Sequence, residues 1–235
     1  MISRNNMTDL FLSNFIPVSL IDYPGVISSV AFFNGCNLRC RYCHNPELVN
    51  SALGENRLEE FLSSLEGKDI EGVAVSGGEP LFLPDMPEFL RTLKDRGFLV
   101  KLDTNGSYPG RLERVCGEGL ADFVSVDLKA FNDSDVKEIT RSNYGIDKFN
   151  KTIDVLREHK VGFEVRHTLW KVPDEDDVKS VVSGLSDAGL VVQFPVRNGR
   201  WLDKRFDISL SPDEHALIRA MFDKYDVKYR NSFDS

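Results

Sequence analysis

The sequence predicts an α/β fold, an incomplete parallel (βα)6 barrel, and two observations support this. Apolar segments with strand character alternate with segments of helical period along almost the whole chain, which is the pattern of repeated βα units. The connections are short, and 235 residues leave no room for the eight units of a closed barrel. An open, doubly wound sheet is the alternative. We expect a single domain over residues 1–235, with a core at about 17–194 and a C-terminal helix and tail at 195–235.

Six apolar runs are the predicted strands, in the order 26–33, 72–76, 98–102, 123–127, 161–168 and 191–194. The segments between and after them have the spacing of apolar residues typical of helices, at 58–65, 86–96, 111–116, 146–159, 174–188 and 213–225. The acidic run 174–177 follows Pro173, and we interpret it as the start of a helix because carboxylates stabilise the exposed N–H groups there.

Composition and charge exclude several classes of partner. The chain has 29 Lys and Arg against 37 Asp and Glu, a net charge of −8, and it has no block of basic residues, so a nucleic acid is not expected as the primary partner. No apolar run approaches the roughly 20 residues that cross a bilayer, so we expect no membrane association and a cytoplasmic protein.

Three of the four cysteines lie in one short segment directly after the first predicted strand. Cys36, Cys40 and Cys43 have the spacing C-x3-C-x2-C, and thiolates are ligands of iron–sulfur clusters and of zinc. Closed sites usually have four protein ligands, so three thiols indicate an open position for a substrate or cofactor. A structural zinc site with His44 as fourth ligand is the alternative, although His44 directly beside Cys43 is sterically awkward. Cys116 lies in a predicted helix and is interpreted as a small buried residue.

The parity of the strands places polar side chains on one face near their carboxyl ends. Side chains at i, i+2 and i+4 of a strand share a face, and we expect the face that carries the polar residues to line the barrel lumen. The residues are Ser76, Asp103, Ser125, Asp127, Lys129, Glu164 and Arg166. A neighbouring carboxylate pair is costly unless a positive group lies between the two, so Asp103 and Asp127 suggest that something positive binds there. A network of internal ion pairs is the alternative.

The cysteine motif resembles the signature of the radical S-adenosylmethionine (SAM) superfamily, and two further features agree with it. Tyr42 is an aromatic residue just before the third cysteine, and the second predicted strand leads into Gly77-Gly78-Glu79-Pro80, which is similar to the glycine-glycine-glutamate-proline motif of that superfamily. The resemblance implies a 4Fe-4S cluster on Cys36, Cys40 and Cys43, with SAM bound to the fourth iron. It also implies that Glu79 and the backbone of Gly77 and Gly78 meet the amino group of SAM.

Four local strings resemble the activating enzymes of glycyl-radical enzymes. They are Ser19-Leu20-Ile21-Asp22-Tyr23-Pro24-Gly25, Cys43-His44-Asn45-Pro46, Asp103-Thr104-Asn105-Gly106 and Asp127-Leu128-Lys129. The resemblance spans roughly residues 17–194, and it is closest to the group that activates anaerobic ribonucleoside-triphosphate reductase.

This second resemblance assigns residues to the cofactor. Asp103, Thr104 and Asp127 would lie beside the methionine end of SAM, where pyruvate formate-lyase activase has a monovalent-cation site, and Lys129 would interact there. Arg166 would complete the charge balance or steer a partner loop, and an ion pair with Glu164 is the alternative.

These features predict a radical SAM enzyme that takes a hydrogen atom from a glycine of a glycyl-radical enzyme, with anaerobic ribonucleotide reductase as the expected protein substrate. An electron donor such as flavodoxin or ferredoxin is implied. Asp22-Tyr23-Pro24-Gly25 replaces the Asp-Gly-Pro-Gly of pyruvate formate-lyase activase, so the protein substrate is less determined than the chemistry. The alternatives are an activase of that type, a radical SAM enzyme acting on a small molecule or modified nucleobase, and a non-catalytic metal-binding or electron-transfer module.

Overall fold

The computed structural model describes residues 10–50, 54–195 and 201–230, which form one curved eight-stranded sheet with strands in chain order. The strands are β1 (Leu12–Ser19), β2 (Ser28–Phe33), β3 (Gly72–Gly77), β4 (Leu99–Thr104), β5 (Phe123–Leu128), β6 (Gly162–Thr168), β7 (Gly189–Gln193) and β8 (Val227–Arg230). Strands β2 to β8 are parallel, and β1 is antiparallel to β2. As far as the structure describes the chain, the edge strands β1 and β8 do not pair with each other, so the predicted incomplete barrel is confirmed.

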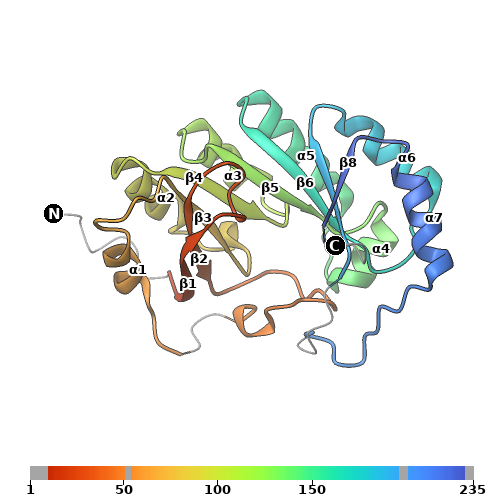
Figure 1. Ribbon diagram of the computed structural model, residues 1–235, viewed down its shortest axis with the longest axis horizontal. Coiled ribbons are helices and arrows are strands. Elements are labelled where there is room, and N and C mark those ends of the chain that lie inside the picture. Colours follow the sequence, from red (N-terminus) through yellow and green to blue (C-terminus); the bar gives the residue numbers. More distant parts are fainter. Residues whose placement is uncertain (1–9, 51–53, 196–200, 231–235) are drawn as a thin grey trace.

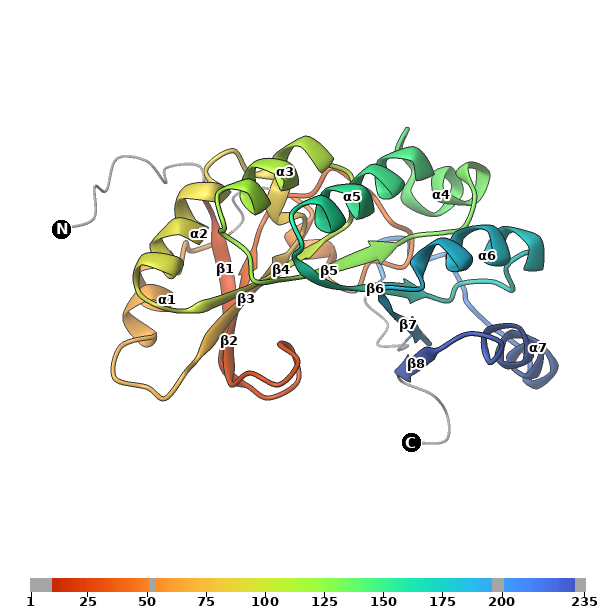
Figure 2. The same cartoon turned by 90° about the horizontal axis from the view of Figure 1, so that it is seen from above.

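Within the described residues, seven α-helices follow the strands and cover the outer side of the curved sheet (Figures 1 and 2). They are α1 (Leu58–Ser64), α2 (Met86–Asp95), α3 (Pro109–Gly117), α4 (Asp133–Thr140), α5 (Ile146–Glu158), α6 (Glu175–Val182) and α7 (Pro212–Phe222). The described connections also contain the short 3-10 turns η2 (Pro46–Leu48), η3 (Pro80–Phe82) and η4 (Ser183–Leu185). In the described part of the chain, no helix is both long and apolar enough to traverse a bilayer.

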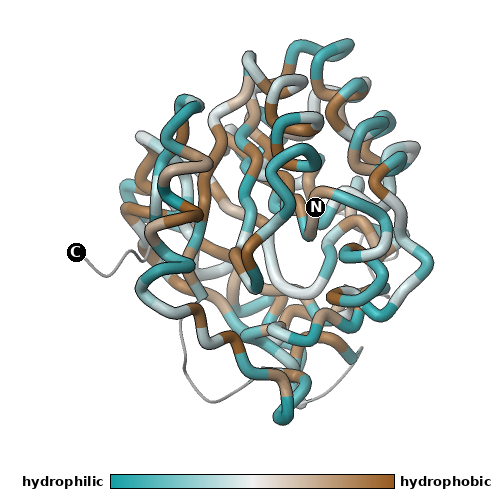
Figure 3. The backbone as a smooth tube through the Cα atoms, turned by 90° about the vertical axis from the view of Figure 1, so that its right-hand side faces the viewer, coloured by the Kyte–Doolittle hydropathy of each residue, from teal (hydrophilic) through white to brown (hydrophobic). Residues whose placement is uncertain are grey.

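The main core lies between the sheet and these helices. Hydrophilic and hydrophobic residues alternate along the outer helices (Figure 3), and in α2 the buried face carries Phe89, Leu90 and Leu93. Phe89 packs against Phe33 of β2 with ring centroids 4.9 Å apart. Complete burial of a side chain of this size stabilises the fold by about 1.5–3 kcal/mol, so the packing of the helices on the sheet contributes strongly to its stability.

All six predicted strands are present as β2 to β7, but the count of six was too low. Strand β1 was missed because it contains Pro17 and several exposed residues and pairs only with β2, with irregular register. Strand β8 has only four residues and lies in the segment expected to be a helix and tail. Both are edge strands, whose sequences need not show the apolar runs of a buried strand.

The helix predictions needed two corrections. Helix α4 is short and polar and was not predicted, and the helix predicted over 174–188 ends at Val182, where η4 takes over. The interpretation of the acidic run as a helix start is confirmed, because the Asp174 carboxylate accepts hydrogen bonds from the backbone N–H groups of Asp176 and Asp177.

Candidate active site

The cysteine loop (residues 34–45) leaves β2 at the rim formed by the carboxyl ends of the parallel strands. Two N–H groups of the loop, those of Arg39 and Arg41, donate to the carbonyl oxygens of Thr140 and Ile139 at the end of α4, at 3.0 and 2.9 Å. The C-terminal carbonyls of a helix have no partners within the helix, so α4 is a ready acceptor for this loop. A helix that the sequence did not predict therefore fixes the position of the motif.

A second support comes from the C-terminal strap (residues 201–206). The N–H of Leu202 donates to the carbonyl of Cys43 at 3.2 Å, and the N–H of Asp203 donates to that of Arg41 at 3.1 Å. The Asp203 carboxylate accepts hydrogen bonds from the guanidinium groups of Arg41 and Arg141. The strap, about 160 residues further along the chain, thus packs on the cysteine loop, and no local sequence pattern predicts this contact.

The three thiols of the motif are not in disulfides, and Cys40 is the most deeply buried of them. Burial raises the pKa of Cys36 to about 12 and that of Cys40 to about 11, and it raises the pKa of Cys43 as well. The ammonium group of Lys129 acts in the opposite direction on all three. The thiolate is the form that binds metal, and burial disfavours it. A metal centre at this loop would supply the positive charge that stabilises the three thiolates.

The described residues contain no three His, Cys, Asp or Glu side chains that already converge on a single ion. Cys116 is buried in α3, in agreement with its interpretation as a packing residue.

Gly77 and Gly78 bring the end of β3 into close contact with the cysteine loop. A Cβ atom on Gly77 would lie 2.2 Å from the carbonyl oxygen of Phe33, and one on Gly78 would lie 2.1 Å from that of Gly35. Gly77 also has a φ of +125°, which disfavours other residues. The implied contact of this backbone with SAM stays a prediction, and the structure adds a second reason for glycine at both positions, the close approach of two backbones.

Glu79 joins the β3 turn to the segment after β4. Glu79 is only 1% exposed. Its carboxylate accepts hydrogen bonds from the Thr104 hydroxyl at 2.8 Å and from the N–H groups of Asn105 at 2.6 Å and Leu81 at 3.1 Å. Burial raises the pKa of Glu79 to about 7 in spite of these donors. This carboxylate therefore organises the turn, and its assignment to the amino group of SAM stays a prediction.

The predicted pair of carboxylates in the lumen is present, and the positive group between them belongs to the chain itself. Arg166 donates from Nε to Asp127 at 3.0 Å and from Nη1 to Asp103 at 3.4 Å. The ammonium group of Lys129 donates a hydrogen bond to Asp127 at 3.0 Å, and that of Lys101 donates one to Asp103. The alternative pairing of Arg166 with Glu164 is not the one formed.

Glu164 instead accepts a hydrogen bond from Ser125 at 2.9 Å and faces Arg230 of β8 at 3.6 Å. Lys101 and Arg230 were not identified from the sequence. Lys101 lies two residues before Asp103 on the same strand, so its side chain shares the inner face and could have been predicted. Arg230 lies on a strand that was not predicted.

The charges of this lumen network are strongly coupled. Burial alone would raise the pKa values of Asp103 and Asp127, but Arg166 together with the lysine beside each carboxylate, Lys101 or Lys129, outweighs it. The pKa of Asp127 therefore falls to about 2, and that of Asp103 is also lowered. Burial would likewise lower the pKa of Lys129, yet the adjacent Asp127 carboxylate raises it. Lys129 also lies 6.0 Å from the centre of the Tyr42 ring, which connects the lumen network to the cysteine loop.

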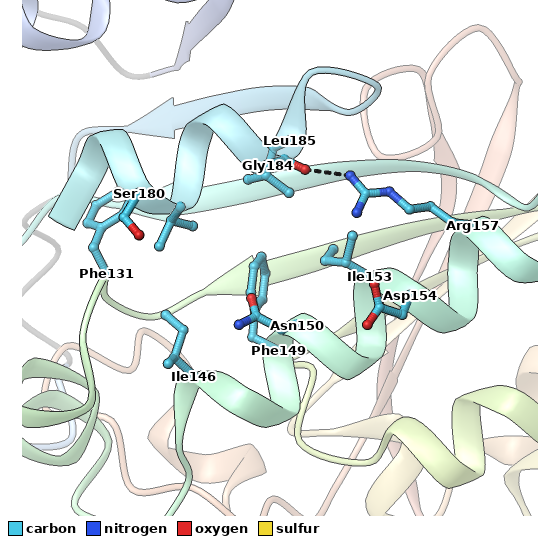
Figure 4. Close-up of a pocket in the computed structure, with 11 residues that line it drawn as sticks. Phe131, Ile146, Phe149, Asn150, Ile153, Asp154, Arg157, Ser180, Gly184 and Leu185 are labelled. Atoms are coloured by element: carbon cyan, nitrogen blue, oxygen red, sulfur yellow. Dashed lines mark hydrogen bonds between the residues drawn. The ribbon is translucent and has the colours of Figure 1, made fainter. Parts of the chain in front are cut away.

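A cavity of about 280 Å³ lies elsewhere, between α5 and the α6–η4 segment (Figure 4). Its lining includes Phe131, Phe149 and Ile153, and at its edge Arg157 donates a hydrogen bond to the carbonyl of Gly184. None of the predicted site residues lines this cavity. It is therefore separate from the cysteine loop and the lumen network.

Comparison with known proteins decides the family of this site. Residues 30–183 match the family model described as the radical SAM superfamily. The chain belongs to the radical SAM superfamily. Membership implies a 4Fe-4S cluster and SAM, and it makes the chain an enzyme.

Relatives within the superfamily are similar over almost the whole chain. A protein of Methanocaldococcus jannaschii named as a glycyl-radical enzyme activating enzyme is 32% identical over 213 residues, covering 88% of each chain. The pyruvate formate-lyase-activating enzyme of Clostridium pasteurianum is 32% identical over 222 residues, covering 91% of this chain and 85% of its own. The fold is shared with SuiB of Streptococcus suis bound to S-adenosylmethionine, with a TM-score of 0.61 and 13% identity over 83% of this chain. This chain spans 47% of SuiB.

Proposed function

We propose that this enzyme activates a glycyl-radical enzyme by reductive cleavage of SAM and removal of a hydrogen atom from a glycine of its partner. The observation that carries the proposal is the similarity to two proteins named as activating enzymes of this type over 88% and 91% of the chain. Similarity of that extent includes the cysteine loop, the β3 turn and the lumen network together.

The residues at the cysteine loop fit an iron–sulfur cluster. Three buried or partly buried thiols lie on one loop, with pKa values that burial raises and with a lysine nearby, and the loop is anchored on both sides. Cys36, Cys40 and Cys43 would therefore hold the cluster. When bound, a cluster with an open iron supplies the electron that splits SAM, and the resulting 5′-deoxyadenosyl radical takes the glycine hydrogen.

The chain's own groups would orient SAM beside that loop. Glu79 and the backbone of Gly77 and Gly78 would receive its amino group, in agreement with a buried carboxylate that has a hydrogen-bonding position left. Asp103, Thr104, Asp127, Lys129 and Arg166 would surround the methionine end.

The charge balance of the lumen network suits the carboxylate of SAM. The network of Lys101, Arg166 and Lys129 with Asp103 and Asp127 has three positive and two negative groups, so one positive charge is in excess. A monovalent cation between the two aspartates would have to displace Arg166, and we therefore propose that the chain's own cations neutralise them.

The partner we propose is anaerobic ribonucleoside-triphosphate reductase, with flavodoxin or ferredoxin as electron donor. The incomplete barrel supports a protein substrate, because the sheet is open between β1 and β8 in the described chain. An extended loop could pass through this opening and bring its glycine to the rim where the cysteine loop lies.

The test is the formation of a glycyl radical. The reconstituted and reduced protein is mixed with SAM and the candidate reductase without oxygen, and the electron paramagnetic resonance (EPR) spectrum is recorded. We expect the glycyl doublet, and we expect its loss with Cys40→Ala or with a reductase whose glycine is replaced by alanine. A doublet only with pyruvate formate-lyase would correct the partner. Turnover of SAM with a purified metabolite and no doublet with any glycyl-radical enzyme would overturn the proposal.

A further inference from the structure

We propose that Asn105 is a positioning residue that donates a hydrogen bond to the sulfur of Cys36 and thereby raises the reduction potential of the cluster. This inference rests on the proposed function, because it concerns the cluster assigned to the cysteine loop. It adds a residue that no motif assigns to the cluster. The argument depends on how each polar atom of the Asn105 side chain is used.

Asn105 is held rigidly at the end of β4. Its residue is 5% exposed, and its N–H donates to Glu79 at 2.6 Å. Its side-chain oxygen accepts two hydrogen bonds from Ser107, one from the backbone N–H at 3.0 Å and one from the hydroxyl at 2.5 Å. Because a backbone N–H can only donate, the oxygen of the amide must face Ser107, and its NH2 group must face the opposite way.

The NH2 group of Asn105 faces the cysteine loop. Its nitrogen lies 3.1 Å from Oδ1 of Asn37 and 4.0 Å from Sγ of Cys36. The orientation of Asn37 is fixed as well, because the Ser107 hydroxyl donates its hydrogen to Asn105 and can therefore only accept, at 2.9 Å, from the NH2 group of Asn37. One of the two hydrogens of Asn105 is thus used by Asn37, and among the described residues the other has the sulfur as its acceptor.

The Cys36 sulfur already accepts one hydrogen bond, from the N–H of Leu38 at 3.4 Å. A contact of 4.0 Å is at the long end for a donor to sulfur, but the sulfur gains negative charge when it becomes a thiolate ligand, and hydrogen bonds to charged acceptors are shorter and stronger. Donors to cluster sulfurs stabilise the reduced state, which carries more negative charge, and so raise the potential. Asn105 also links the cluster to Glu79 through its backbone.

The experiment measures the potential of the reconstituted cluster in the full chain without SAM, by EPR-monitored redox titration. Loss of a differential stabilisation of about 1 kcal/mol changes the ratio of reduced to oxidised cluster about five-fold. In a one-electron couple this is a shift of about 40 mV. We expect Asn105→Ala to shift the potential by about this amount toward more negative values.

Two further variants keep the test decisive. Asn105→Asp keeps the shape and the acceptor for Ser107 but presents an oxygen to the sulfur, so it should shift the potential in the same direction even if the alanine variant does not fold. Ser107→Ala removes the two hydrogen bonds of the hydroxyl, to Asn105 and from Asn37, but keeps the backbone N–H of Ser107 that orients the Asn105 amide. The donor to Cys36 is retained, so the potential of this variant should stay near the wild-type value.

The outcomes separate the two proposals. If the wild-type protein assembles no cluster whose EPR signal responds to SAM, the proposed function fails. If it does, but both Asn105 variants keep the wild-type potential, or Ser107→Ala shifts it equally, then only the role of Asn105 is refuted.

Discussion

The buried ion pair of Lys101 and Asp103 offers a quantitative test of the lumen network. The two side chains are 3% and 17% exposed. Two unit charges at a hydrogen-bonding distance of about 2.8 Å attract each other by about 6 kcal/mol at an effective dielectric constant of about 20. Burial of both ions offsets most of this, and Asp103 retains Arg166 at 3.4 Å when Lys101 is removed. We therefore expect a net coupling of about 2 kcal/mol, typical of a hydrogen bond between charged groups.

The assay is a double-mutant cycle of urea unfolding at pH 7 on the chain without cofactors, with Lys101→Met, Asp103→Asn and the double variant. The control cycle uses Lys151→Met and Asp147→Asn, which remove the same kind of pair, at 3.5 Å, with side chains 67% and 65% exposed. An exposed pair of this kind contributes about 0.3–0.5 kcal/mol.

The two pairs consist of the same charged groups, so the difference between the cycles measures what the lumen adds, which is burial together with the neighbouring Arg166. A coupling of Lys101 and Asp103 below about 0.5 kcal/mol, equal to that of the control, would refute the view that the lumen network is a tightly coupled unit.

Three further predictions concern other parts of the site. Gly78→Ala would force a Cβ to within 2.1 Å of a carbonyl oxygen of the cysteine loop, and should lower the free energy of unfolding by about 3 kcal/mol or more, whereas Gly110→Ala, with open space at its Cβ, should have little effect in the same urea experiment. His167 is buried with its pKa lowered to about 4, mainly by burial, so its ring should remain neutral in an NMR titration from pH 8 to pH 5, and a midpoint near 6.5 would contradict the packing. Asp203→Asn weakens the contacts of the strap with Arg41, so the amide of Asp203 should exchange with deuterium faster than in the wild type, and an unchanged rate would show that the strap holds without the carboxylate.

Much of the sheet was predictable because its central strands are buried on both sides. The runs that became β2 to β7 are apolar and short, and the alternation along β4, β5 and β6 correctly indicated which residues share the inner face with Asp103 and Arg166. The edges were not predictable on the same grounds. Strand β8 is stabilised by its single neighbour and carries two charged residues, so only tertiary structure identifies it as a strand.

The site was predictable in its residues but not in its pairings. The period of a strand shows that Asp103, Asp127 and Arg166 face the same way, but it does not show which carboxylate a long guanidinium will reach. The strap and α4, which hold the cysteine loop, could not be found from a local pattern because the contacts join segments far apart in the chain. Asn105 belongs to the sequence Asp103-Thr104-Asn105-Gly106, but the orientation of its side chain depends on contacts with Ser107, Asn37 and Glu79 that the sequence does not show.

The measurement that tests the central claim most directly is the EPR spectrum of the anaerobically reconstituted, reduced protein before and after SAM is added. If Cys36, Cys40 and Cys43 hold a cluster with one iron free of protein ligands, the spectrum should change when SAM binds, and Cys40→Ala should lack the signal. A spectrum that SAM leaves unchanged, with the metal enclosed entirely by protein donors, would contradict the account.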